Sequence, residues 1–186
     1  MPILGTVSSQ FSGKPFGSFE SISTVSLNSS QATIEFTSIP ATYTHLQLRF
    51  IARGSYGSDS GVHIRFNSDT GSNYSRHRVY GENTTAGSDG SDNNTEMVAG
   101  KIGNVSNIFG AAIIDILDYA NTNKYKTIRG LVGHDRNASG GIVLLASGNW
   151  RNTNAVTSIL LRLDDYSLGG EWQQYSQFSL YGIKGV

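Results

Sequence analysis

Residues 109–117 read FGAAIIDIL, and this stretch decides the fold class. Successive side chains of a β-strand point to opposite faces. Both faces of this segment are aliphatic: Ala111, Ile113 and Leu117 lie on one, and Ala112, Ile114 and Ile116 on the other. A strand in a two-layer sandwich normally has one solvated face, so the second apolar face must be covered by an arm, a loop or another chain. We therefore expect Phe109, Ile114 and Ile116 to form an oligomer interface.

Outward from this stretch, the same two-residue alternation recurs in short segments along most of the chain. They are residues 19–27, 32–36, 46–52, 62–66, 76–80, 125–131, 142–146, 156–163 and 178–183. Gly-, Ser- and Asn-rich connections separate them, which is typical of short strands joined by turns. No segment has a sustained helical period with caps. The sequence predicts nine or ten strands in an all-β, antiparallel β-sandwich of the jelly-roll or Greek-key type.

The connections between these segments give more specific predictions. Residues 28–31 are expected to be the turn of one hairpin, and residues 118–124 the turn of a second. Residues 82–94, ENTTAGSDGSDNN, are too polar to bury apolar area. We expect them to form a long loop on the surface.

Length and composition limit the classes of function. The 186 residues fit one domain, and 14 basic residues cancel 14 acidic ones. A chain without a positive field is not expected to bind nucleic acid. It has no run of about 20 apolar residues, so no membrane span is expected. Cysteine is absent, which leaves packing or neighbouring subunits to supply stability.

Residues 1–18 contain scattered Ser, Gly and apolar residues without a period. We interpret them as an extended N-terminal arm, followed by a single domain at residues 19–186. The alternative is an unattached terminus. The apolar residues through which such an arm would contact its partner are Ile3, Leu4, Val7, Phe11 and Phe16.

A search for chemistry finds no catalytic centre. The four histidines have no metal-ligand spacing, and neither a nucleophile elbow nor a cysteine is present. Asp115 with Asp118, or Asp164 with Asp165, could serve a glycosidase only if a pair flanked a cleft. Residues 67–73 place oxygen side chains at alternate positions as calcium loops do, but a polar turn explains them more simply. We expect no catalytic residue, no metal and no cofactor.

Aromatic residues are concentrated in the last third of the chain, among amide and carboxylate side chains. They are Trp150, Tyr166, Trp172 and Tyr175. Flat aromatic rings beside polar groups can stack on sugars, and they can equally fill a core or anchor a protein interface. The interface or core is favoured, and glycan stacking is kept as the alternative.

Several sequence blocks together resemble a family of small phage virion proteins, common in phages of cyanobacteria and other aquatic bacteria. The blocks are PILGT at 2–6, FESI at 19–22, SIPATYTHLQLR at 38–49, RFNSDTGSNY at 65–74, IDILDYANTNKYKT at 114–127 and SLYGIKG at 179–185. The resemblance implies a non-enzymatic virion protein with a jelly-roll body. It favours a capsid decoration, or cement, protein that forms a homotrimer on the major capsid protein.

This resemblance also implies a location: the virion, at the capsid surface rather than the tail, after synthesis in the host cytoplasm. The alternative is a receptor- or glycan-binding module of a phage tail fibre or spike, since the same fold would suit it. Under that alternative a glycan is the ligand, and the aromatic residues of the last third form the binding site.

Overall fold

The computed structural model describes residues 19–56, 59–137, 140–164 and 169–184. The proposed arm at residues 1–18 lies outside this part of the chain, as do its expected contact residues Ile3, Leu4, Val7, Phe11 and Phe16. Tyr166, one of the aromatic residues considered for glycan stacking, lies outside it as well. The expectations for these residues stay predictions.

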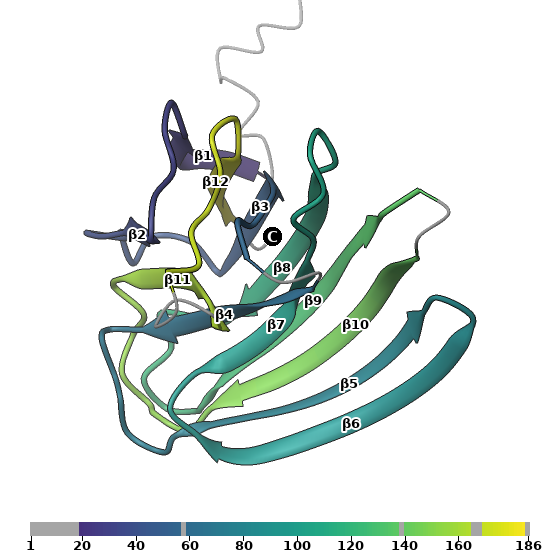
Figure 1. Ribbon diagram of the computed structural model, residues 1–186. Helices are drawn as coiled ribbons and strands as arrows, with labels where there is room; N and C mark the ends of the chain where they lie inside the picture. Colours follow the sequence, from purple (N-terminus) through teal and green to yellow (C-terminus); the bar gives the residue numbers. More distant parts are fainter. Residues whose placement is uncertain (1–18, 57–58, 138–139, 165–168, 185–186) are drawn as a thin grey trace, which may run out of the picture.

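The described residues form an all-β fold of twelve strands, with no α-helix among them. The strands are β1 (Phe19–Ser26), β2 (Thr33–Phe36), β3 (His45–Ala52), β4 (Ser60–Phe66), β5 (Tyr74–Glu82), β6 (Thr85–Asn94), β7 (Met97–Ile102), β8 (Gly110–Leu117), β9 (Lys126–Asp135), β10 (Gly141–Trp150), β11 (Ile159–Leu163) and β12 (Gln177–Ile183). They make two antiparallel sheets that pack as a β-sandwich, as the sequence predicts (Figure 1).

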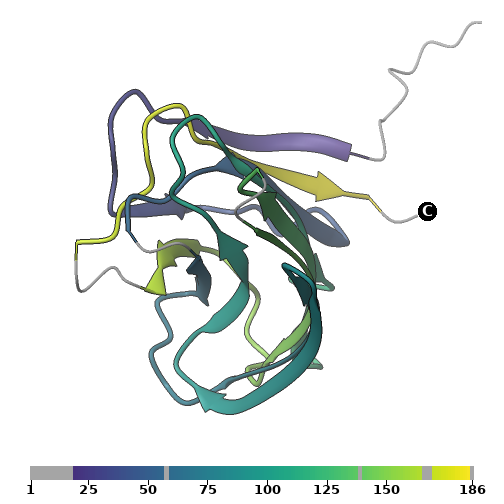
Figure 2. The same ribbon diagram turned by 45° about the vertical axis from the view of Figure 1, so that its right-hand side comes forward.

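The two sheets differ in size. The large sheet has eight strands in the order β1-β12-β3-β8-β9-β10-β5-β6, and the small sheet has four in the order β2-β11-β4-β7. Strands β8, β9 and β10 follow one another along the chain and pair as successive antiparallel hairpins, which confirms the hairpin predicted around residues 118–124. Figures 1 and 2 show the large sheet curving around β4 and β7, and β7 packs against β9 and β10.

The predicted N-terminal hairpin is wrong. β1 pairs with β12 in the large sheet, and β2 pairs with β11 in the small sheet. Residues 28–31 therefore cross from one sheet to the other. Along this crossing the backbone of Gln31 exchanges two hydrogen bonds with that of Trp172, at 2.9 and 2.8 Å. A hairpin turn and a crossing between sheets need the same polar residues, so composition could not distinguish them.

The long surface loop predicted at residues 82–94 is also wrong. Most of it is β6, which pairs with β5 at the edge of the large sheet. Asp89 accepts hydrogen bonds from Nε of Arg78 at 2.9 Å and from its Nη2 at 2.5 Å, and it also pairs with Arg76. Backbone pairing and these ion pairs hold an edge strand that has almost no apolar side chains. The sequence did not predict two of the strands, β6 and β7.

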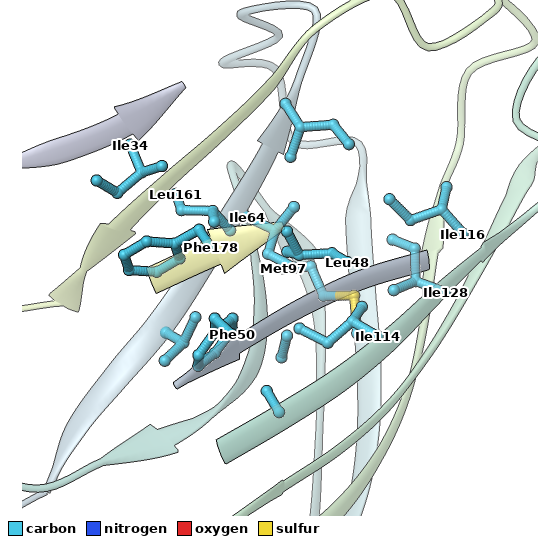
Figure 3. Close-up of a cluster of buried hydrophobic side chains, with 14 of the residues drawn as sticks. Ile34, Leu48, Phe50, Ile64, Met97, Ile114, Ile116, Ile128, Leu161 and Phe178 are labelled. Atoms are coloured by element: carbon cyan, nitrogen blue, oxygen red, sulfur yellow. The ribbon is translucent and has the colours of Figure 1, made fainter. Parts of the chain in front are cut away.

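The core lies between the sheets and is filled by alternate residues of the central strands. Figure 3 shows Ile114 and Ile116 among these side chains, near Leu48 and Ile128. Both isoleucines are 0% exposed within a single chain, so the prediction that they form an oligomer interface is wrong. Both faces of β8 are aliphatic, and the two-residue period alone does not say which face the small sheet covers.

Candidate interaction surface

The outer face of the large sheet, turned away from the small sheet, carries exposed aliphatic side chains where a solvated sheet would be polar. Six of them are each between 47% and 59% exposed: Ile51, Val79, Ile113, Leu131, Val143 and Leu145. We call these six residues the aliphatic face. Isolated exposed apolar residues are ordinary, whereas a contiguous group marks a site of contact.

The strand register makes this group contiguous, in two rows across β3, β8, β9, β10 and β5. One row consists of the cross-strand neighbours Ile113, Leu131, Leu145 and Val79. The second row consists of Ile51, Ala111, Gly133, Val143 and Gly81. Neighbouring strands lie about 4.8 Å apart and alternate residues about 7 Å apart, so the rows form one patch about 20 Å wide.

Small residues hollow one end of this patch. A depression of about 910 Å3 lies over Gly81, Gly133 and Ala111, with Phe109 and Val143 along its sides. Gly133 cannot gain a side chain, because an added Cβ would lie 2.8 Å from the carbonyl oxygen of Ile142. The half-buried Phe109 lies at the side of this depression and so borders the exposed patch. Its expected role at an interface stays a prediction.

A charged rim borders the aliphatic face on one side. Asp115 accepts a hydrogen bond from Nη2 of Arg129 at 2.8 Å and from Nε2 of Gln47 at 2.8 Å. Burial raises the pKa of Asp115, but the hydrogen bonds from Arg129 and Gln47 outweigh it, so the pKa lies below its ordinary value. Nε of Arg49 donates to Gln47 at 2.6 Å. At neutral pH the rim therefore presents both signs of charge.

The chain matches no protein-family model, no curated protein and no solved structure. Within the described ranges there is no helix of the length and apolar character that a bilayer span requires.

The two tryptophans do not form a glycan site. Trp150 and Trp172 are both 0% exposed, which agrees with the favoured assignment to a core or interface and contradicts the alternative of glycan stacking. Trp150 packs on Phe66 with ring centroids 5.5 Å apart, and Trp172 packs on Phe178 at 4.9 Å. These large rings fill the space between the sheets. Tyr175 differs, because 76% of it is exposed.

The loop at residues 67–73 is a structural connection. Asp69 accepts hydrogen bonds from the indole nitrogen of Trp150 at 2.7 Å, Nδ2 of Asn73 at 2.9 Å and the amide of Gly71 at 2.8 Å. Burial raises the pKa of Asp69, but the hydrogen bonds from these donors lower it by more, so its pKa lies below the ordinary value. N–H donors occupy the positions that a calcium ion would need. No cluster of three potential metal-ligating acids or histidines occurs among the described residues.

The candidate carboxylate pair Asp115 and Asp118 lacks the property that a glycosidase requires. One of its two carboxyl groups must have a raised pKa to act as a general acid. The hydrogen bond from Lys124 lowers the pKa of Asp118, and the pKa of Asp115 is lowered as well. Both side chains are held ionised. In the second pair, Asp165 lies outside the described residues.

The sequence did contain a signal for the residues of the aliphatic face that it failed to predict. Residues 142–146, IVLLA, are aliphatic on both faces, as residues 109–117 are. In the structure Leu144 and Ala146 are buried, while Val143 and Leu145 are exposed. A second strand with two apolar faces could have located the patch, because adjacent strands share a face once they pair.

Proposed function

We propose that this chain is a non-enzymatic structural protein of a phage particle, most specifically a capsid decoration protein. The aliphatic face carries this proposal, because an exposed apolar patch serves contact with another macromolecule. The resemblance of the sequence blocks supports the phage particle and the capsid surface. Under this proposal the chain is made in the host cytoplasm and joins the shell through the major capsid protein.

The proposed occupant of the aliphatic face is a neighbouring copy of this chain, in the homotrimer that the resemblance implies. With 14 basic and 14 acidic residues, the chain has no net charge, so copies do not repel one another strongly. The rim carries Arg129 and Arg49 beside Asp115, so a second copy can meet each charge with its opposite.

The free energy gained by burying the aliphatic face is too small for strong association in solution, and it supports association on a capsid that holds the copies side by side. Full burial of an aliphatic side chain contributes about 1.5–3 kcal/mol, and each side chain here is about half exposed. Six such side chains give roughly 5–9 kcal/mol before costs, whereas association costs about 4–15 kcal/mol. The face alone holds copies weakly, and a capsid that positions them side by side removes much of the cost.

The aliphatic face is tested by introducing a charge at its centre. Leu131→Glu should lower the occupancy of the chain on the capsid, as measured by cryo-electron microscopy of the particle, because an ionised carboxylate is costly to bury. The matched control is Thr127→Glu, which lies on the same strand and the same outer face, exposed but outside the patch. Equal occupancy of wild type, Leu131→Glu and Thr127→Glu on the capsid would refute contact through this face.

The capsid position is tested by locating the chain in cryo-electron micrographs of the intact particle. Density for the β-sandwich is expected on the outer shell, around three-fold positions. Deleting residues 1–18 should reduce occupancy there while leaving the sandwich folded, as measured by circular dichroism. Density confined to the tail would overturn the decoration role, and unchanged occupancy after truncation would overturn the role of the arm.

The alternative function, a receptor- or glycan-binding module of a tail fibre or spike, is supported by fewer candidate residues than the sequence suggested. It loses Trp150 and Trp172, which are buried, and keeps Tyr175. The test is a glycan array with variants of Trp150 and Trp172. Loss of glycan binding in a variant that still folds would contradict the assignment of these two residues to the core.

A further inference from the structure

Tyr175 has a backbone conformation that is unusual for an aromatic residue. Its φ angle is 71°, and the other described non-glycine residues with positive φ are all Asn, Ser or Asp. Short polar side chains tolerate this left-handed region, whereas a bulky residue there is an outlier that costs about 1–3 kcal/mol. The same residue is 76% exposed, so burial of the ring does not offset the strain.

The backbone around Tyr175 is fixed from both sides, which explains how the strain persists. The amide of Tyr175 donates to the carbonyl oxygen of Leu27 at 2.8 Å. The amide of Leu27 donates in turn to the carbonyl oxygen of Ser176 at 2.9 Å. Figures 1 and 2 show the β1–β2 connection running beside the segment that leads into β12. The ring is thus held outward from a rigid support.

Beside the ring lies a pocket of about 290 Å3 with a polar lining. Besides Tyr175, its lining includes Asn28, Ser30, Arg53, Phe109, Gln173 and Gln174. Nε2 of Gln174 donates to the carbonyl oxygen of Asn28 at 2.8 Å, and Nε2 of Gln173 donates to Oγ of Ser30 at 3.2 Å. Both glutamine amides are thereby oriented, and within the described part of the chain no donor reaches their Oε1 atoms.

We propose that this pocket binds one sugar residue of a glycan, with Tyr175 as the stacking platform. Amide and hydroxyl groups can both donate to and accept from sugar hydroxyls. A flat ring packs against the C–H face of a pyranose, and the pocket volume is close to the lower limit for small-ligand sites. No carboxylate lines the pocket, and the guanidinium of Arg53 lies 5.9 Å from the ring of Phe109. This assignment is independent of where the chain sits in a particle.

The test is saturation-transfer NMR on the full chain with three probes: methyl glucoside, methyl galactoside and methyl N-acetylglucosaminide. At least one should receive saturation from the protein. Tyr175→Asn should weaken that binding by about tenfold or more, because the platform is removed while Asn suits the same backbone region. The control Tyr125→Ala removes an exposed tyrosine outside the pocket and should leave binding unchanged.

Stability separates a binding role of Tyr175 from a packing role. Tyr175→Asn should unfold at the same or a higher temperature, since the backbone strain is relieved. The buried Trp150 and Trp172 report folding through their fluorescence. Saturation transfer to none of the three glycosides, equal transfer in Tyr175→Asn, or a lowered unfolding temperature of that variant would each overturn the proposal.

Discussion

Replacing Glu96 with Gln should destabilise the protein at neutral pH and remove much of its acid sensitivity. The Glu96 side chain is only 3% exposed, and it binds three basic side chains on β4 and β11. Nη2 of Arg65 lies 2.5 Å from Oε1, Nε of Arg162 donates to Oε1 at 2.9 Å, and Nδ1 of His63 lies 2.9 Å from Oε2. The carboxylate thus connects the start of β7 to β4, its neighbour in the small sheet, and to β11 beyond it.

The magnitude follows from the pKa of this carboxyl group. Burial raises the pKa of Glu96, but the hydrogen bonds from His63 and Arg162 outweigh it and lower the pKa from 4.5 to about 2. At about 1.4 kcal/mol per unit, this difference corresponds to about 3 kcal/mol of stability. Because the folded-state pKa is the lower one, the contribution is fully present above pH 4.5 and is lost as the pH falls towards 2.

Urea denaturation at neutral pH and at several acidic pH values measures this contribution. Wild type should exceed Glu96→Gln by about 3 kcal/mol or more at pH 7, since the variant leaves two guanidinium groups without their carboxylate. The gap should close as the pH approaches 2. The control Glu35→Gln removes an exposed carboxylate from the same small sheet and should change little. A gap between wild type and Glu96→Gln that stays constant with pH would refute the reasoning.

Two further substitutions test the packing. Lys126→Met should destabilise the protein by about 2–4 kcal/mol in thermal or urea unfolding, because the buried Nζ donates to the carbonyl oxygens of residues 121, 124 and 153 at 2.5, 2.9 and 3.0 Å; an unchanged midpoint would contradict this. Gly100→Ala should cost about 1–3 kcal/mol, because its Cβ would lie 2.5 Å from Cβ of Val132. Its control Gly81→Ala, where the nearest atom is 3.8 Å away, should be tolerated, and equal effects would count against the packing argument.

The sequence predicted the strands that have alternating or doubly apolar patterns, and it missed two strands. One is β6, which is held by polar contacts, and the other is β7, whose Met97, Ala99 and Ile102 are buried in the core. β6 has almost no apolar residues, so its pairing with β5 depends on the backbone ladder and on Asp89. The pairing of β1 with β12 joins the two ends of the domain. Local patterns contain no information about such distant partners, because sheet pairing depends on which segments meet in three dimensions.

The candidate sites show the same division. The doubly apolar pattern at residues 109–117 predicted a second apolar face that an arm, a loop or another chain covers. The structure places Ile114 and Ile116 in the core and Ile113 on the exposed face, and the covering of that face stays a prediction. For the aromatic residues near the C-terminus the sequence favoured a core or an interface over glycan stacking, and both tryptophans are core residues. Only the backbone angle and exposure of Tyr175 separate it from them.

The all-β class follows from residue order alone, because side chains alternate along any extended segment whatever its partners. Residue order also determined that at least one strand has more apolar surface than a single chain needs to bury. Which side of that strand faces the small sheet depends on three-dimensional packing, since turning the strand over exchanges its two faces without changing its period. The same packing decided which aromatic rings fill the interior and which one faces solvent.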